Sequence, residues 1–319
     1  MRLPLRSVGG GAAFAFVLAL AAQTPRPDVF TIRDNVELVI LDVAVQDARG
    51  AFARNLQRQN FRVWEDGRPR DISHFSAEDV PVTVGLVVDN SASMIRKRAE
   101  VITAGLAFTR ESNPRDRFFV VNFNDSVIPG LPNSLRFTDD PSTLRSALYV
   151  GKPQGKTALY DAIVYGIRHL ELSGEEKRTL VIVSDGGDNA SHTSSPELMK
   201  TIEASRATIY TIGLYDADSG DLRPGVLRKI ARVSGGQYFE PKQMADVLPA
   251  FQAISADIRH RYTIGFVPGR YEKARVVRSL KVMAEVDGRK LKVRTRASYS
   301  AGPPEYFGDK GDKAGGEIR

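Results

Sequence analysis

The chain has 319 residues, of which 42% are hydrophobic and 8% aromatic, so it can bury an ordinary core in one large domain or two smaller ones. It has no cysteine, which excludes disulfides, thiolate metal sites and cysteine nucleophiles. Its net charge is +7, and the strip from Arg259 to Arg296 alone holds 12 Lys or Arg against 3 Asp or Glu, so the positive charge is concentrated there.

The N-terminal segment has the pattern of a secretory signal peptide. Arg2 and Arg6 precede an apolar run over residues 12–20, which is followed by two alanines. This run is too short to cross a bilayer as a stable helix. The pattern predicts a signal peptide at 1–22 and an exported, periplasmic or extracellular protein that is not inserted in a membrane after the signal is removed.

Residues 29–79 read as β-strands. The segment "VELVILDVAVQD" mixes β-branched and apolar residues, and two short runs flank Asp66-Gly67, a dipeptide that favours a tight hairpin turn. We expect three or four antiparallel strands here, forming the N-terminal part of a β-sandwich.

Residues 80–259 alternate between apolar strand patterns and helical patterns. Val82–Val88 is a nearly continuous apolar run, as expected for a strand that is covered on both faces. The alternation predicts a mostly parallel sheet with helices on both faces. The predicted elements are strands at Val82–Val88, Phe118–Phe123, Thr179–Ser184 and Thr208–Leu214, an extended edge strand within Ser126–Phe137, and helices at Ile95–Arg110, Pro141–Val150, Ala158–Leu172, Pro196–Ser205, Leu222–Val233 and Met244–Ile258.

Residues 260–299 return to strand patterns at Tyr262–Val267, Val276–Val286 and Leu291–Ser298, with a second tight turn at Asp287-Gly288. Each flanking β segment is too small to form a comfortable domain alone, but together they offer about seven strands, which is typical of a small sandwich. We therefore predict one β-sandwich made from both ends of the chain, with the α/β domain inserted between them. The tail at 300–319 is predicted to be disordered.

The basic strip has a simple structural interpretation. Lys290, Lys292, Arg294 and Arg296 alternate with less polar residues, which indicates the solvated face of a half-buried strand. We therefore expect no nucleic-acid partner.

Five oxygen-bearing side chains fall where predicted strands meet loops or where a helix starts. Asp89, Ser91 and Ser93 follow the first strand of the α/β region, Thr157 starts a helix, and Asp185 ends a later strand. Ligands bind at the carboxyl ends of strands in open α/β sheets, so these side chains should meet at one rim. Two carboxylates and three hydroxyls suit a hard cation such as Mg²⁺.

This order of residues resembles the metal-ion-dependent adhesion site of the von Willebrand factor A (VWA) family. Over roughly Ile40 to Gly302 the chain is also similar to a group of exported bacterial VWA-related proteins, through "FRVWEDGRPRDISHFSAEDVPVTVGLVVDNSASM" and "YTIGFVP…KVRTRASYSAG". The resemblance implies a Rossmann-like α/β domain that holds Mg²⁺ or Mn²⁺. Ser91, Ser93 and Thr157 would be hydroxyl ligands, and Asp89 and Asp185 would act directly or through water.

The resemblance also implies a function. Two carboxylates leave a divalent ion under-neutralised and with an open position, which attracts a further carboxylate. We expect an exported, metal-dependent protein-binding module for adhesion or assembly, whose partner presents Asp or Glu to the metal, and we expect no enzymatic activity.

Other functions are weaker interpretations of the same residues. "GKPQGKT" has three residues between its glycines where a phosphate-binding P-loop has four. A nucleophilic Asp89 would want an acidic group at position 91, which is a serine, and no G-x-S-x-G elbow frames a serine for a hydrolase. The alternatives kept open are a structural component of an envelope assembly with a vestigial metal site and, less favoured, a metal-dependent hydrolase.

Overall fold

The structure is a computed structural model that describes residues 38–215, 224–269 and 277–301. The predicted signal peptide and residues 302–319 of the predicted tail lie outside these ranges. The described residues form a six-stranded sheet and two smaller antiparallel sheets, with helices in the α/β part.

The six-stranded sheet is mostly parallel, as predicted. Its strand order is β10-β9-β8-β5-β6-β7, and only β7 runs antiparallel to its neighbour. Every residue of β5 is buried, which explains why its sequence is apolar without alternation. The strands are β5 (Val82–Asp89), β6 (Arg117–Phe123), β7 (Val127–Pro129), β8 (Lys177–Ser184), β9 (Thr208–Gly213) and β10 (Tyr238–Phe239).

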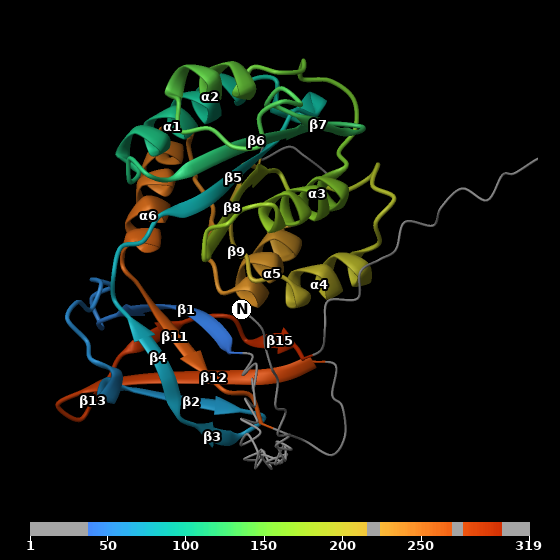
Figure 1. Ribbon diagram of the computed structural model, residues 1–319. Coiled ribbons are helices and arrows are strands. Elements are labelled where there is room, and N and C mark those ends of the chain that lie inside the picture. Colours follow the sequence, from blue (N-terminus) through green and yellow to red (C-terminus); the bar gives the residue numbers. More distant parts are fainter. Residues whose placement is uncertain (1–37, 216–223, 270–276, 302–319) are drawn as a thin grey trace, which may run out of the picture. The chain divides into compact units, whose positions relative to one another are not determined.

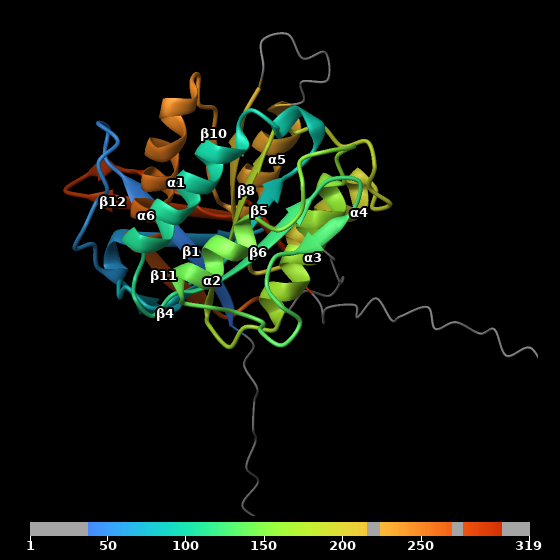
Figure 2. The ribbon, with the colours of Figure 1, turned by 90° about the horizontal axis from the view of Figure 1, so that it is seen from above.

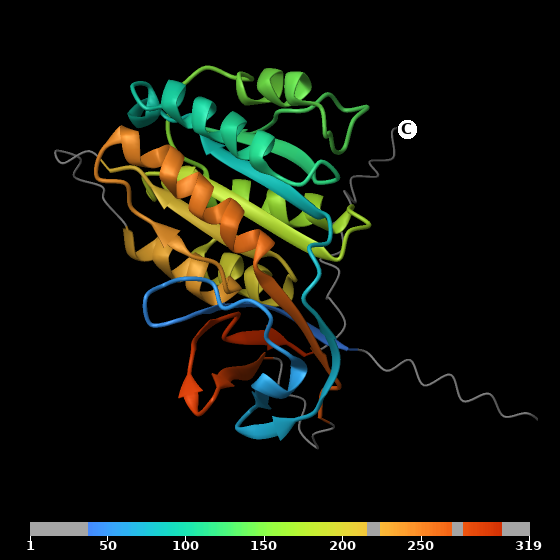
Figure 3. The same ribbon diagram turned by 90° about the vertical axis from the view of Figure 1, so that its left-hand side faces the viewer.

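Helices cover both faces of this sheet (Figures 1 and 3). Successive side chains of a strand point to opposite faces, and so Gly105 of α1 lies close to Leu86 while Gly166 of α3 lies close to Val87. Viewed from above, the sheet runs between α1, α2 and α6 on one side and α3, α4 and α5 on the other (Figure 2). The helices are α1 (Arg98–Glu111), α2 (Pro141–Leu148), α3 (Leu159–Glu171), α4 (Ser195–Ala204), α5 (Pro224–Ser234) and α6 (Val247–Arg259).

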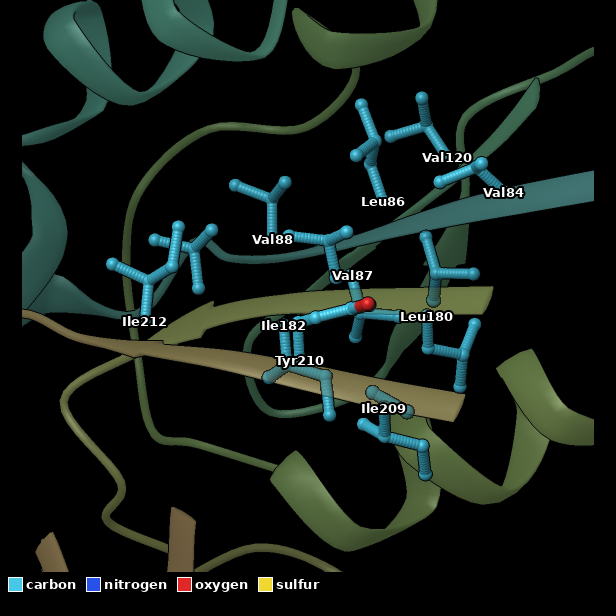
Figure 4. Close-up of a cluster of buried hydrophobic side chains, with 14 of the residues drawn as sticks. Val84, Leu86, Val87, Val88, Val120, Leu180, Ile182, Ile209, Tyr210 and Ile212 are labelled. Carbon is cyan, nitrogen blue, oxygen red and sulfur yellow. The ribbon is translucent and has the colours of Figure 1, made fainter. Parts of the chain in front are cut away.

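The core of the α/β domain is made by the central strands. Side chains from β5, β8 and β9 pack against one another and against β6 (Figure 4). Val87, Ile182 and Tyr210 are completely buried there. This continuous apolar packing fixes the strand ends, and so it fixes the loops that leave them.

The flanking segments form a two-layered β-sandwich, as predicted. One sheet has the order β14-β1-β11-β4, and the other has the order β13-β12-β2-β3 with β15 paired to β12. Phe61, Val63, Tyr262 and Phe266 belong to the buried core between these layers. The strands are β1 (Val39–Gln46), β2 (Phe61–Glu65), β3 (Arg68–Arg70), β4 (Ile72–Ser76), β11 (Arg261–Phe266), β12 (Val277–Val286), β13 (Arg289–Lys290), β14 (Lys292–Arg294) and β15 (Ser298–Ser300).

Both predicted tight turns are present. Asp66 and Gly67 have φ of 48° and 76°, and Asp287 and Gly288 have φ of 49° and 72°. Two successive residues with positive φ match the twist of the strands that they join, which is why Asp-Gly is favoured at these places.

The prediction of one strand at Leu291–Ser298 was wrong. The segment is divided into β14, which pairs with β1 in one layer, and β15, which pairs with β12 in the other. The prediction of a solvated basic face fails with it. Lys290 and Lys292 are exposed, but Arg294 donates to the buried Asp257 of α6 and Arg296 is only 9% exposed. These two arginines face polar acceptors on the inserted domain instead of water.

The two ends of the inserted domain are tied to one carboxylate. Asp116 lies in the loop that connects α1 to β6, and it is buried. Its Oδ1 accepts the backbone N–H of Val82 at 2.9 Å, and its Oδ2 accepts Nη2 of Arg259 at 2.8 Å. Val82 begins β5 and Arg259 ends α6, so the chain enters and leaves the α/β domain at neighbouring points.

Smaller differences concern edges of the central sheet. The extended strand expected within Ser126–Phe137 is only Val127–Pro129, and the two-residue β10 was not predicted. Within the described ranges, none of the helices combines the length and the apolar character needed to cross a bilayer.

Candidate metal centre

The candidate site lies where the order of the central sheet reverses. The chain passes from β5 to β6 on one side of β5, and β8 pairs with β5 on the other side. Asp89 is the last residue of β5, and Asp185 directly follows β8. The carboxyl ends of these two neighbouring parallel strands therefore bring both carboxylates to one rim, at the switch point where α/β sheets bind ligands.

Asp89 is completely buried. Its Oδ1 accepts the backbone N–H of Ser91 at 2.8 Å, and its Oδ2 accepts the hydroxyl of Ser184 at 2.6 Å. Burial raises the pKa of Asp89 to about 6, although the hydrogen bonds from Ser184 and Ser91 oppose this rise. A carboxylate that is buried without a cationic partner favours the approach of a cation.

Ser91, Ser93 and Asp185 form a continuous chain of oxygen contacts. The two serine hydroxyl oxygens are 3.0 Å apart, and the Ser93 hydroxyl donates to Oδ2 of Asp185 at 2.6 Å. Ser91 is 2% exposed, whereas Ser93 lies at the surface. The alternating spacing of the serines in the loop after β5 thus aims both hydroxyls at one point, next to the loop after β8.

Thr157 lies two residues before α3, and both its backbone N–H and its carbonyl are hydrogen-bonded. Its N–H donates to Oδ1 of Asn189 at 2.9 Å, and its carbonyl accepts the N–H of Asn189 at 3.0 Å. The preceding loop is bound to the serine loop, since Ala92 N–H donates to the carbonyl of Gly155 at 3.2 Å. Thr157 is therefore fixed between the other two loops. Within the described part of the chain, its hydroxyl makes no hydrogen bond.

The chemistry of this donor set fits a hard divalent cation. All five side chains offer oxygen, two of them as carboxylates. Those of Ser91, Ser93 and Asp185 already contact one another, and Asp89 accepts the backbone N–H of Ser91. In the described ranges no group of three or more His, Cys, Asp or Glu side chains could hold a metal ion.

Three supporting residues were not predicted from the sequence. Ser184 bonds to Asp89, Asn189 holds Thr157, and Asp125 accepts the N–H of Lys156 at 3.2 Å. Ser184 could have been found, because it directly precedes Asp185 at the end of a buried strand. Asn189 and Asp125 give no signal of their own, since Asn and Asp are ordinary loop residues.

The structure argues against a phosphate-binding loop at Gly151–Thr157. The N–H groups of Gln154, Lys156 and Thr157 already donate to Asn90, Asp125 and Asn189. These amides cannot cradle a phosphate without breaking those bonds. Likewise, the His192 ring contacts Oδ2 of Asp161 at 3.3 Å, which gives no support to a hydrolase triad of His192 with Ser184 and Asp185.

The fold and the rim define an α/β domain with an oxygen-lined candidate cation site at its switch point. A family model described as "von Willebrand factor type A domain" matches residues 84–187, the segment that contains all five side chains. The inserted α/β domain thus belongs to the von Willebrand factor type A family. No curated protein matches the chain.

Solved structures are similar to parts of this chain, and the first of the three named here supports the same fold. A von Willebrand factor type A protein from Catenulispora acidiphila is similar over 82% of this chain and 73% of its own, with 13% identity and a TM-score of 0.51. The conserved hypothetical protein BatB from Bacteroides thetaiotaomicron matches 56% of this chain and 97% of its own, with 18% identity and a TM-score of 0.45. The vWF domain of the pilus tip protein Mfa5 from Porphyromonas gingivalis matches 57% and 96%, with 15% identity and a TM-score of 0.45.

Proposed function

We propose that this protein is an exported binding module that holds a protein partner through a divalent metal ion, Mg²⁺ or Mn²⁺. Asp89, Ser91, Ser93, Thr157 and Asp185 would hold the ion. The observation that carries the proposal is the contact chain from Ser91 through Ser93 to Asp185, above the buried and unneutralised Asp89.

The side chains have different tasks in this proposal. Ser91 and Ser93 offer neutral oxygens, and Asp185 orients the Ser93 hydroxyl by accepting its hydrogen bond. Both oxygens of Asp89 already accept hydrogen bonds, so Asp89 supplies buried negative charge and orients the serine loop. A bound ion would supply an open coordination position for an Asp or Glu of the partner.

The proposed module is a binder and not an enzyme. Asp185 accepts a hydrogen bond from the Ser93 hydroxyl, but among the described residues no histidine bonds to Ser91 or Ser93 as the base of an activated nucleophile would. Export rests on the charged, apolar and small-residue order at the N-terminus.

The test is a pull-down from envelope extract with the purified protein, in Mg²⁺ and in EDTA. We expect partners that are captured in Mg²⁺ and lost in EDTA, and that neither Asp89→Ala nor the more exposed Asp185→Ala captures. Removing one partner carboxylate from a captured protein should weaken binding roughly 30-fold or more, since truncating a desolvated charged pair costs on the order of 2–5 kcal/mol.

Asp79→Ala is the matched control, because this aspartate pairs with Arg259 at the other end of the sheet and takes no part in the rim. It should capture the same proteins as the wild type. Capture at full strength in EDTA would end the metal-bridge proposal. A purified protein that binds no magnesium would favour the alternative, a structural component of an envelope assembly with a vestigial metal site.

A further inference from the structure

A buried polar cluster lies directly behind the serine loop, at the C-terminal end of α2. Arg98 of α1 donates from Nη1 to Oδ1 of Asn90 at 2.6 Å and from Nη2 to the carbonyls of Leu148 at 3.1 Å and Val150 at 3.4 Å. Asn90 Nδ2 donates to the same Val150 carbonyl at 3.2 Å. One guanidinium thus joins the loop after β5 to the end of α2.

The charge of Arg98 has no carboxylate partner among the described residues. The side chain is buried, at 9% exposure, and burial lowers the pKa of its guanidinium. Its charge is met by the amide oxygen of Asn90, by the carbonyl of Leu148 at the negative end of the α2 dipole, and by the carbonyl of Val150 just beyond the helix. Burying a charge in this way is costly. Packing alone does not require it, because an apolar side chain of similar length would fill the space.

The two loops joined by Arg98 are the two that present hydroxyls to the candidate metal centre. Asn90 lies between Asp89 and Ser91, and its carbonyl accepts the N–H of Gln154 at 2.8 Å. The loop that starts at Val150 ends at Thr157. The cluster therefore fixes the beginning of the Thr157 loop against the serine loop.

We propose that Arg98 is a positioning residue for the metal centre: by bridging Asn90 and the end of α2, it sets the separation of the Ser91 and Thr157 hydroxyls and so the affinity for the ion. This inference rests on the proposed metal-dependent function. Arg98 acts through Asn90 and does not itself touch the ion.

The test is calorimetric titration of Mg²⁺ and Mn²⁺ into the wild-type protein, Arg98→Lys and Arg98→Met. We expect both variants to bind roughly 10- to 100-fold more weakly, the usual effect of losing a group that orients metal ligands. Lysine keeps the positive charge but cannot donate in a planar fork to an amide and two carbonyls. A loss of affinity in Arg98→Lys would therefore be due to the lost hydrogen-bond geometry and not to a lost charge. Tighter binding by Arg98→Met would show that the charge merely repels the ion, and would overturn the inference.

Arg296→Lys is the matched control. Arg296 is also 9% exposed and donates to the carbonyls of Ile202 at 3.2 Å and Ser205 at 2.6 Å, at the end of α4 instead of α2. It should lower the melting temperature as Arg98→Lys does but leave the affinity for the ion unchanged. Equal losses of affinity in the two variants would mean general destabilisation and would overturn the inference.

The titration also separates failure of this inference from failure of the proposed function. A wild-type protein that binds neither ion would end the metal-dependent function. A wild-type protein that binds, together with an Arg98→Lys variant of equal affinity, would leave the metal centre standing and remove the role of Arg98.

Discussion

Asp89 and Asp257 are equally buried carboxylates in opposite electrostatic settings. Asp89 is surrounded by hydroxyl and N–H donors, and burial raises its pKa. Asp257 of α6 accepts Nε and Nη2 of Arg261 at 3.0 and 2.8 Å, and also bonds to Arg294 and the Tyr210 hydroxyl. Burial also opposes the charge of Asp257, but the two arginines outweigh it, so the pKa of Asp257 is lowered.

The difference separates a structural carboxylate from one that can accept a ligand. Asp257 has its counter-charge within the chain, because Arg261 begins β11 and Arg294 ends β14 of the sandwich. Among the described residues Asp89 has no such counter-charge beside it, and in the proposed function a cation from solution would take this place. Burial alone therefore does not mark a candidate binding site, whereas burial of a carboxylate without an internal cation does.

The largest expected effect on stability is at Asp257, the structural carboxylate of the pair. Asp257→Asn should lower the free energy of unfolding by about 3–5 kcal/mol, because it leaves Arg261 and Arg294 buried without their shared carboxylate. Urea denaturation followed by circular dichroism measures this loss. Asp79→Asn, which weakens a more exposed pair with Arg259, should cost about 1 kcal/mol or less. Equal costs in the two variants would contradict the assignment of Asp257 as a structural anchor.

Glu65 of β2 is a third buried carboxylate, and its contribution to stability should depend on pH. Burial opposes its charge, but hydrogen bonds from Tyr299, Arg278, the Gly269 N–H and Arg70 outweigh it and lower the pKa from 4.5 to about 2. Because the unfolded chain takes up the proton first, the stabilisation by Glu65 is complete above pH 4.5 and is lost as the pH falls towards 2. At about 1.4 kcal/mol per pKa unit, the loss is about 3 kcal/mol.

The measurement compares the wild type with Glu65→Gln. The difference between their free energies of unfolding should be largest near pH 5 and should shrink by up to about 3 kcal/mol by pH 2.5, because the variant lacks the titrating group. A difference that stays constant over this range would show that Glu65 does not titrate with a lowered pKa.

The smallest expected effect is at Asp89. Without metal, Asp89→Asn should change the free energy of unfolding by less than about 1 kcal/mol, because an amide can still bond to Ser91 N–H and the Ser184 hydroxyl. In Mg²⁺ at about 100 times its dissociation constant, the wild type should gain about 2.7 kcal/mol and the variant almost nothing. Thermal melts with and without Mg²⁺ measure both quantities. A full magnesium shift in the variant would place the ion elsewhere.

The fold was predictable where local signals and long-range packing agree. The apolar run of β5 and the Asp-Gly turns each have one good structural solution, and the alternation of strands and helices restricts the sheet to a few arrangements. Leu291–Ser298 was not predictable in the same way. Its alternation is that of a half-buried strand, but only the partners in three dimensions decide that Arg294 meets Asp257 and that the segment crosses from one layer to the other.

The hydroxyls and carboxylates of the candidate site could be predicted from the sequence, but the residues that hold them in place could not. Asp89, Ser91, Ser93 and Asp185 stand at strand ends or in the loop that follows, where topology dictates that they meet. Arg98 looks like an ordinary polar residue near the start of a helix. Its burial depends on the carbonyls at the end of α2, 50 residues further along the chain, and no local pattern records that contact.

The shared anchoring of Val82 and Arg259 on Asp116 has a mechanical consequence. A partner held at the rim would pull on Asp89, and the tension would pass lengthwise along β5. That strand is hydrogen-bonded on both sides, to β6 and β8, so its ladders would be loaded in shear and would resist together instead of opening one bond at a time. At the opposite end of β5 the load would divide between the two chain connections that converge on Asp116. The sandwich would then bear the force through two tethers that leave the domain side by side.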